Sequence, residues 1–135
     1  MMRNVFLSIL MTGFLFAVDV HGEEKVFRAI PGNDGVQRVD VVGGSYFFSP
    51  DHIVVKVGVP VELRVRKEPG ITPHTIVLKA PEAGINFDVG LATETKEIRF
   101  TPEKTGRYEF YCDKKIPFLE SHREKGMHGV LEVIN

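Results

Sequence analysis

Four side chains that can bind a soft metal ion follow one another along the chain: His74, Cys112, His122 and Met127. Cys112 is the only cysteine among the 135 residues, so it cannot form an intramolecular disulfide. An exposed thiol is open to oxidation in an oxidising compartment, and ligation by a metal would protect it. Two imidazoles and a thiolate in one plane, with a long thioether contact, are typical of copper sites that transfer single electrons. The residue types therefore predict a site for one copper ion, Cu(I) or Cu(II).

Two other readings of the same residues start from the cysteine. Zinc accepts two histidines and a cysteine, but a thioether is a poor fourth ligand for it. Without a metal, Cys112 could be an inert core thiol, since cysteine packs as a small hydrophobic residue, and the histidines and Met127 would be incidental. If a metal binds, the thiol must lose its proton, so the affinity should fall at low pH.

The period of two in residues 108–112 places Cys112 in the interior. Tyr108, Phe110 and Cys112 share one face of the predicted strand, and the two aromatic residues make that face the core face. Cys112 then lies at the strand's end, where the loop carrying His122 and Met127 begins. His74 stands directly before another predicted strand, so it too can lie at one end of the fold.

About eight segments of the chain are rich in β-branched and aromatic residues and are separated by turn residues. In residues 61–66 apolar and charged residues alternate, which places Val61, Leu63 and Val65 in the core and the charged residues in solvent. The pair Gly43-Gly44 is expected to end a strand, and residues 81–95 to form a loop with a helical turn. The pattern predicts an all-β fold, an antiparallel Greek-key sandwich or barrel. The predicted strands are residues 36–42, 46–48, 52–57, 61–66, 75–78, 96–100, 108–112 and 130–134.

The first 22 residues are typical of a secretory signal peptide. Arg3 precedes an apolar stretch, residues 5–18, that is short for a membrane span, and cleavage is expected after Gly22. An uncleaved anchor is the alternative. Residues 23–135 then form one copper-binding domain that is periplasmic or secreted, with no membrane contact beyond the signal segment. The formal net charge of −1 gives no reason to expect nucleic acid as a partner.

The chain resembles the cupredoxins, the plastocyanin- and azurin-like small blue copper proteins, from about residue 44 onward. The resemblance rests on residues 46–50, 53–58, 73–75, 100–102, 106–112 and 122–133. It implies that His74, Cys112 and His122 are equatorial copper ligands and that Met127 is the axial ligand. It also implies a cupredoxin-like sandwich.

Two features depart from the family pattern. Nine residues, 113–121, separate Cys112 from His122, where the family usually has two to four, so this segment must bulge out or fold over the site. Thr75 follows the first histidine where many members have asparagine, and its hydroxyl could do the same work of tying the ligand loops together.

Two further histidines need an assignment. His128 follows Met127 directly and should face solvent, because adjacent residues in an extended chain point to opposite sides. The alternative is that His128 replaces or supplements His122 or Met127. His52 is expected to be a surface turn residue.

The function that these features favour is one-electron transfer by a monomer to transient redox partner proteins. His122 would present an edge near the surface, with an apolar docking patch at residues 116–119 and with Lys114 and Lys115 on its rim. The alternative is copper sequestration, tolerance or delivery through the same site. Catalysis on a small molecule is a third hypothesis, but no acid–base pair points to an enzyme.

Overall fold

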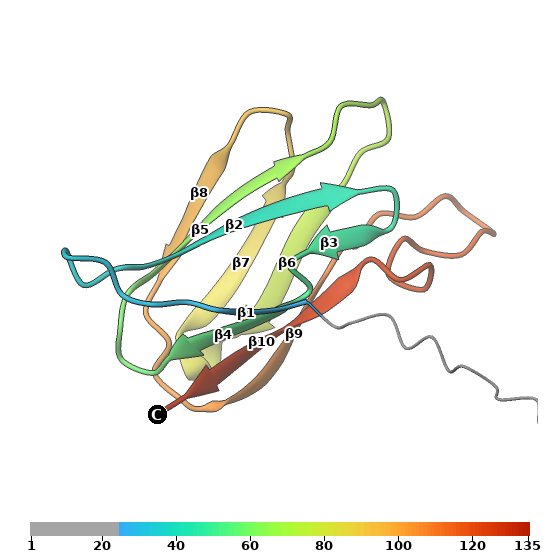
Figure 1. Ribbon diagram of the computed structural model, residues 1–135. Coiled ribbons are helices and arrows are strands. Elements are labelled where there is room, and N and C mark those ends of the chain that lie inside the picture. Colours follow the sequence, from blue (N-terminus) through green and yellow to red (C-terminus); the bar gives the residue numbers. More distant parts are fainter. Residues whose placement is uncertain (1–24) are drawn as a thin grey trace, which may run out of the picture.

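The computed structural model describes residues 25–135, and the predicted signal segment, residues 1–22, lies outside them. The described chain forms ten β-strands in two sheets, with one short 3-10 turn at Pro81–Ala83 (Figure 1). The two sheets make a β-sandwich, which confirms the predicted fold class. In residues 25–135 no helix is long and apolar enough to cross a membrane.

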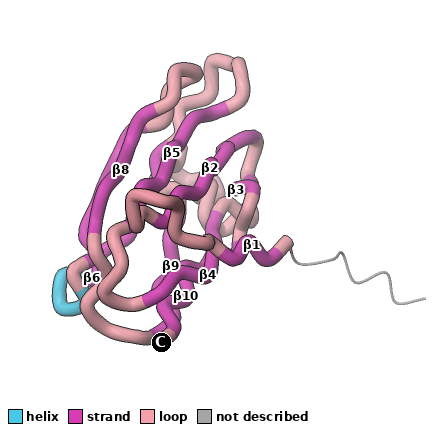
Figure 2. The backbone as a smooth tube through the Cα atoms, turned by 60° about the vertical axis from the view of Figure 1, so that its left-hand side comes forward, coloured by secondary structure: helices cyan, strands magenta, loops and turns pink. Residues whose placement is uncertain are grey.

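The larger sheet has six strands in the order β1-β4-β10-β9-β6-β7, and the smaller has four in the order β3-β2-β5-β8. Figure 2 shows the strands of the two layers and the loops that connect them at the ends of the sandwich. The strands of the larger sheet are β1 (Val26–Arg28), β4 (His52–Lys56), β6 (Thr75–Ala80), β7 (Ile85–Gly90), β9 (Gly106–Tyr111) and β10 (His128–Ile134). Those of the smaller sheet are β2 (Gln37–Gly44), β3 (Phe47–Ser49), β5 (Val61–Lys67) and β8 (Lys96–Phe100).

Both sheets are mixed, whereas the sequence predicted antiparallel pairing throughout. Strand β2 pairs in parallel with β5, and β4 pairs in parallel with both β1 and β10. In each of these pairs the chain between the two strands visits the other sheet before it returns. A strand that returns after such a crossover can run in the same direction as its neighbour, which a hairpin does not allow.

The core follows the alternation of the strands. Val61, Leu63 and Val65 are at most 2 % exposed, as the pattern predicts. The prediction that Glu62 faces solvent is wrong, because its side chain is only 5 % exposed. Strand β5 has a neighbour on each side, and the guanidinium groups of three arginines cover the Glu62 carboxylate. These are Arg38, Arg64 and Arg99.

Three elements differ from the sequence prediction. Strand β7 lies inside residues 81–95, which were expected to be a loop with a helical turn. Its inward-facing side chains, Ile85 and Phe87, are buried. Strand β1 lies in a segment for which no strand was predicted, and all its residues are exposed. The strand predicted to stop at residue 42 continues through Gly43 and Gly44, which are buried and where neighbouring side chains occupy the space that a Cβ would need.

Candidate metal centre

The four predicted ligand residues lie at one end of three adjacent strands, β6, β9 and β10. His74 directly precedes β6, Cys112 directly follows β9, and Met127 directly precedes β10. Strand β9 pairs with both of its neighbours near this end, through Val77 with Tyr111 and through His128 with Tyr111. Sheet pairing alone therefore brings together residues that are far apart in sequence.

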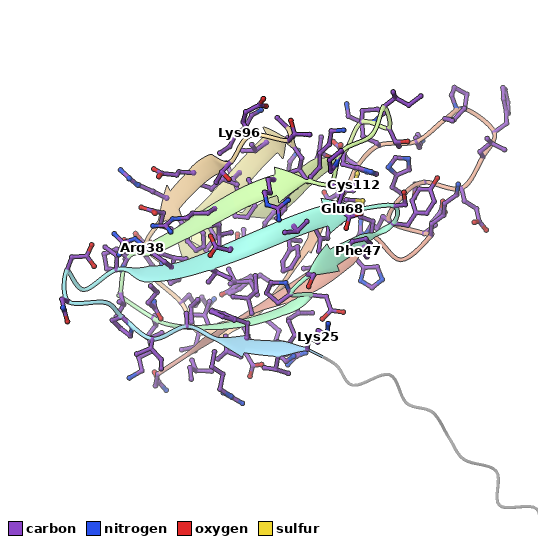
Figure 3. The ribbon with its side chains drawn as sticks, turned by 45° about the horizontal axis from the view of Figure 1, so that its top comes forward. Lys25, Arg38, Phe47, Glu68, Lys96 and Cys112 are labelled. Atoms are coloured by element: carbon purple, nitrogen blue, oxygen red, sulfur yellow. The ribbon has the colours of Figure 1, made fainter. Side chains whose placement is uncertain are left out.

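The side chains of His74, Cys112 and His122 form one buried cluster. One donor atom from each lies within 4.8 Å of the others, and the three residues are 5 %, 0 % and 6 % exposed. The Nδ1 atoms of His74 and His122 are 3.2 Å apart, and Nδ1 of His122 lies 3.6 Å from the Cys112 Sγ. Figure 3 labels Cys112 at the end of the sandwich from which the following loop projects.

Met127 is fully buried, and its backbone joins the other members of the site. Its carbonyl accepts a hydrogen bond from the Cys112 N–H at 3.0 Å, and its own N–H donates to the His122 carbonyl at 2.9 Å. The residue is thus held beside the cluster. That its sulfur is an axial ligand stays a prediction.

The nine-residue segment between Cys112 and His122 bulges out from the sandwich, which was one of the two expected outcomes (Figure 1). The His122 N–H donates to the Lys114 carbonyl at 2.9 Å and so closes the base of the excursion. Because residues 115–121 loop out beyond this hydrogen bond, the insertion does not move His122 away from Cys112. Ile116, Phe118 and Leu119 on the excursion are 62 %, 105 % and 60 % exposed.

Thr75 connects the loops around the thiol. Its backbone N–H donates to the Cys112 Sγ at 3.4 Å. Its hydroxyl donates to the Asp113 carboxylate at 2.6 Å and accepts the Asp113 N–H at 3.0 Å. These contacts match the role expected of a residue that ties the ligand loops together.

The surroundings of both imidazoles of the cluster favour their neutral form. Burial lowers the pKa of His74, and the neighbouring His122 and the Lys67 ammonium lower it further. Burial also lowers the pKa of His122, with a contribution from Lys125. Neutral imidazole is the form that binds metals, so the electrostatics favour ligation.

A model of the cupredoxin-like domain matches residues 8–131, which is most of the chain. The chain belongs to the cupredoxin-like domain family. No curated protein matches this cupredoxin significantly by sequence.

Solved structures similar to this cupredoxin include several copper proteins. The metal-binding domain of the Cu(I)-exporting P-type ATPase CopA from Streptococcus pneumoniae D39, solved with Cu(I), is 28 % identical with a TM-score of 0.60, and the match covers 84 % of this chain and 100 % of that one. A copper-binding protein solved in its apo form is 26 % identical with a TM-score of 0.60, covering 82 % and 99 %. Auracyanin A from Chloroflexus aurantiacus, a blue copper protein, shares the fold at 20 % identity and a TM-score of 0.54, covering 74 % and 100 %.

The cluster of this cupredoxin has the dimensions of a metal site. An ion bonded at about 2.0–2.1 Å to two nitrogens and about 2.3 Å to a sulfur in one plane would separate nitrogen from nitrogen by about 3.5 Å and nitrogen from sulfur by about 3.8 Å. The observed separations of 3.2 and 3.6 Å are close to these values. One thiolate and two imidazoles are also a donor set that suits copper. The residues present therefore fit one copper ion.

The other two histidines of the described chain have opposite outcomes. His128 is exposed at the start of β10, as the alternation predicts. The prediction that His52 is a surface turn residue is wrong, because it is 8 % exposed and begins β4. Its Nε2 lies 2.7 Å from a carboxylate oxygen of Glu132, which also accepts a hydrogen bond from Arg107.

Sequence reasoning missed Tyr46 as a member of the site. Its ring meets the His122 ring edge to face, with 5.1 Å between the ring centroids. His122 is 6 % exposed, and its role as the edge nearest a partner stays a prediction. A tyrosine at a turn between two strands carries no signal in the sequence for a contact with a residue 76 positions later.

Proposed function

We propose that this cupredoxin binds one copper ion through His74, Cys112 and His122, with Met127 as axial ligand, and transfers single electrons. The observation that carries the proposal is the buried cluster in which one donor atom from each of three residues lies within 4.8 Å of the others. A site held by a packed sandwich needs little rearrangement when copper changes its oxidation state. That property suits electron transfer.

Burial favours electron transfer over catalysis on a bound substrate. The three donor residues are at most 6 % exposed, so a molecule would reach the copper with difficulty. An electron, in contrast, needs only a short path through packed atoms. We therefore do not assign an enzymatic activity.

The proposed location is the periplasm or another compartment outside the cytoplasm. Residues 1–22 have the charge and apolar pattern of a secretory signal. A free thiol in such a compartment is exposed to oxidants, and a bound copper ion together with the burial of Cys112 would protect it.

The proposed partners are redox proteins that bind transiently to the excursion at residues 114–119. Its apolar residues 116, 118 and 119 project beside the site, and Lys114 and Lys115 at its base are exposed. This chemistry fits a partner with a small apolar surface edged by carboxylates, in a contact of modest area.

Phe118→Ser should change the unfolding free energy by less than about 0.5 kcal/mol, because the ring is fully exposed. The same change should slow electron exchange between oxidised and reduced copies of this chain, measured by NMR line broadening, but not reduction by ascorbate.

The proposal is tested by adding Cu(II) to the purified protein and recording its visible absorption and electron paramagnetic resonance spectra. We expect one equivalent of copper, a thiolate-to-copper charge-transfer band and reversible redox cycling. Cys112→Ser should abolish the band, and Met127→Leu should keep it while changing the reduction potential. A copper centre that cannot be cycled would refute electron transfer.

A matched pair of variants tests the ligand assignment. His122→Ala should remove or strongly shift the charge-transfer band, because it deletes a buried member of the cluster. His128→Ala should leave the spectrum unchanged, because His128 is exposed. If the two variants exchange these results, His128 is the ligand.

Copper delivery is a second candidate, favoured by the 28 % identity to the metal-binding domain of a Cu(I) exporter. A delivery protein must release its ion, whereas an electron carrier retains it in both oxidation states. Repeated reduction and oxidation in the presence of the Cu(I) chelator bathocuproine disulfonate separates the two functions. Retention of copper over many cycles supports electron transfer, and loss of Cu(I) at each reduction supports delivery.

A further inference from the structure

His122 is the one member of the buried cluster that no strand holds directly. His74 and Cys112 each adjoin the end of a paired strand, β6 and β9. His122 instead lies between the nine-residue excursion and a turn at residues 123–126. Its backbone has hydrogen bonds to Lys114 and Met127, but these bonds do not fix its ring. Its Nδ1 contacts His74 and the Cys112 sulfur, and a further ring contact comes from outside the cluster.

Tyr46 makes the contact that can orient this ring. Its side chain is half-buried in the turn between β2 and β3, and its ring meets His122 at an interplanar angle of 68°. The backbone of Tyr46 has φ of 68°, a region that residues other than glycine seldom adopt. A strained residue of this kind persists where the surrounding contacts hold it, and such residues gather at functional sites.

The turn after His122 holds the tyrosine from its other side. The Lys125 ammonium lies 4.5 Å from the centroid of the Tyr46 ring and 3.5 Å from its hydroxyl. Gly126, with φ of 108°, passes so close that a Cβ at this position would lie 3.5 Å from the Tyr46 carbonyl oxygen. The Tyr46 ring is therefore in contact with His122 and with the turn that follows it.

We propose that Tyr46 is a positioning residue. It latches the loop between β9 and β10, the ligand loop, to the β2–β3 turn and thereby sets how fast the site releases its metal. The metal-release part of this inference rests on the proposed copper function. The latch itself is made of side chains of this chain alone, so it can be tested without copper.

Four variants separate the ring from the turn that carries it. Tyr46→Asn removes the ring but keeps a residue that tolerates positive φ, and Tyr46→Phe keeps the ring and removes only the hydroxyl. Phe47→Asn is the matched control, because it removes an exposed aromatic ring from the adjacent position. Lys125→Met removes the cation above the Tyr46 ring and leaves the tyrosine in place.

The first measurement is the rate at which bathocuproine disulfonate removes Cu(I) from the copper-loaded protein. We expect release to be about ten-fold faster or more in Tyr46→Asn, from the loss of the aromatic contact. We expect about two- to five-fold faster release in Lys125→Met, from the loss of the cation–π contact. Tyr46→Phe and Phe47→Asn should stay within about two-fold of the unmodified protein, since both retain the ring over His122. Equal rates in Tyr46→Asn and Phe47→Asn would overturn the latch.

The second measurement uses the metal-free protein and amide hydrogen exchange followed by NMR. The Met127 N–H, which donates to the His122 carbonyl, reports opening of the ligand loop. Its exchange should be about five-fold faster or more in Tyr46→Asn and unchanged in Tyr46→Phe, while the amides of β4 keep their rates in both. Unchanged Met127 exchange in both Tyr46→Asn and Lys125→Met would refute the latch. Lys125→Met decides the question alone if Tyr46→Asn does not fold.

The two measurements distinguish a wrong proposed function from a wrong latch. A protein that binds no copper refutes the proposed function, and the exchange of the Met127 amide still tests the latch. A protein that binds copper and releases it at the same rate with and without the Tyr46 ring refutes the latch alone.

Discussion

At the scale of single residues, Thr75 shows how one hydroxyl connects two segments of the site. It exchanges hydrogen bonds with both the N–H and the carboxylate of Asp113, directly after the cysteine. A threonine in a sequence can pair with many groups, and only the pairing of β6 with β9 places this one beside Asp113. The role was a reasonable expectation for the residue after His74, but its partner could not be read from the sequence.

Thr75→Val should destabilise the protein by about 1–3 kcal/mol, because it leaves the Asp113 N–H without its acceptor in a partly buried place. Urea unfolding of the metal-free protein measures the change. Thr75→Ser keeps the hydroxyl and is the matched control. Equal stabilities of the valine and serine variants would show that the hydroxyl does not hold the loop.

The cluster of His74, Cys112 and His122 could be predicted from the sequence because cysteine and histidine are rare in this chain. Cys112 has no other cysteine to pair with, and the period of two in residues 108–112 is enough to turn it inward. The burial of His52 could not be predicted, because its partner Glu132 lies 80 positions away on a strand that becomes its neighbour only in the folded sheet. Tyr46 escaped prediction for the same reason.

At the scale of elements, the glycines at the end of β2 allow the smaller sheet to approach the site. A Cβ on Gly43 would lie 2.7 Å from Cδ1 of Leu91 and 3.2 Å from Cε of Met127. A glycine pair usually indicates a turn, and here it indicates close packing within a strand. The sequence alone does not distinguish these two uses, because the difference depends on what packs against the backbone.

Gly43→Ala should therefore destabilise the protein by about 1–3 kcal/mol, as overpacked core positions do. Because Met127 is one of the two residues that must move, the copper-loaded variant should also show a shifted charge-transfer band. The control is Gly90→Ala, at the end of β7, where a Cβ meets nothing within 4 Å. We expect Gly90→Ala to stay within about 0.5 kcal/mol of the unmodified protein. Thermal unfolding and visible spectra of both variants measure these effects.

Eight of the strands were predicted, and the two at the edges of the larger sheet were not. Strands β1 and β7 are the two edges of the larger sheet, where each has a single neighbour. All three residues of β1 are exposed, so it has no inward residues that would produce an alternating pattern. Such a strand forms because β4 offers an unpaired edge, which is a property of the assembled sheet and not of the segment.

At the scale of the whole molecule, each sheet carries an ion network on the side away from the core. Three arginines surround Glu62 in the smaller sheet, while His52 and Arg107 contact Glu132 in the larger. The hydrogen bond from Arg64 is the largest cause of the lowered pKa of Glu62. The hydrogen bond with His52 is the largest cause of the lowered pKa of Glu132, with a further contribution from Arg107. Each sheet therefore contains a glutamate whose protonation at low pH should weaken its ion pairs.

These lowered pKa values predict how stability changes with pH. A carboxyl group whose pKa is lower in the folded chain than in the unfolded chain stabilises the fold above the unfolded value, about 4.3 for glutamate. That contribution is lost as the pH falls through this value toward the folded pKa, because the unfolded chain then binds more protons. The unfolding free energy of the metal-free protein should therefore decrease between about pH 5 and pH 3. Urea unfolding at each pH, in the presence of EDTA, measures it.

The double variant Glu62→Gln/Glu132→Gln separates these two networks from the general acid response of the chain. It should be less stable than the unmodified protein at pH 6, because the cations around positions 62 and 132 lose a charged acceptor, and its stability should fall less steeply below pH 5. Glu82→Gln, at an exposed position in the 3-10 turn, is the control and should keep the original slope. If the double variant and the control lose stability in parallel as the pH falls, the acid sensitivity lies elsewhere. If the unfolding free energy falls less steeply with pH only in the double variant, the acid sensitivity lies on the outer faces of the sheets. Protonation of the two carboxylates there weakens their ion pairs with the neighbouring cations.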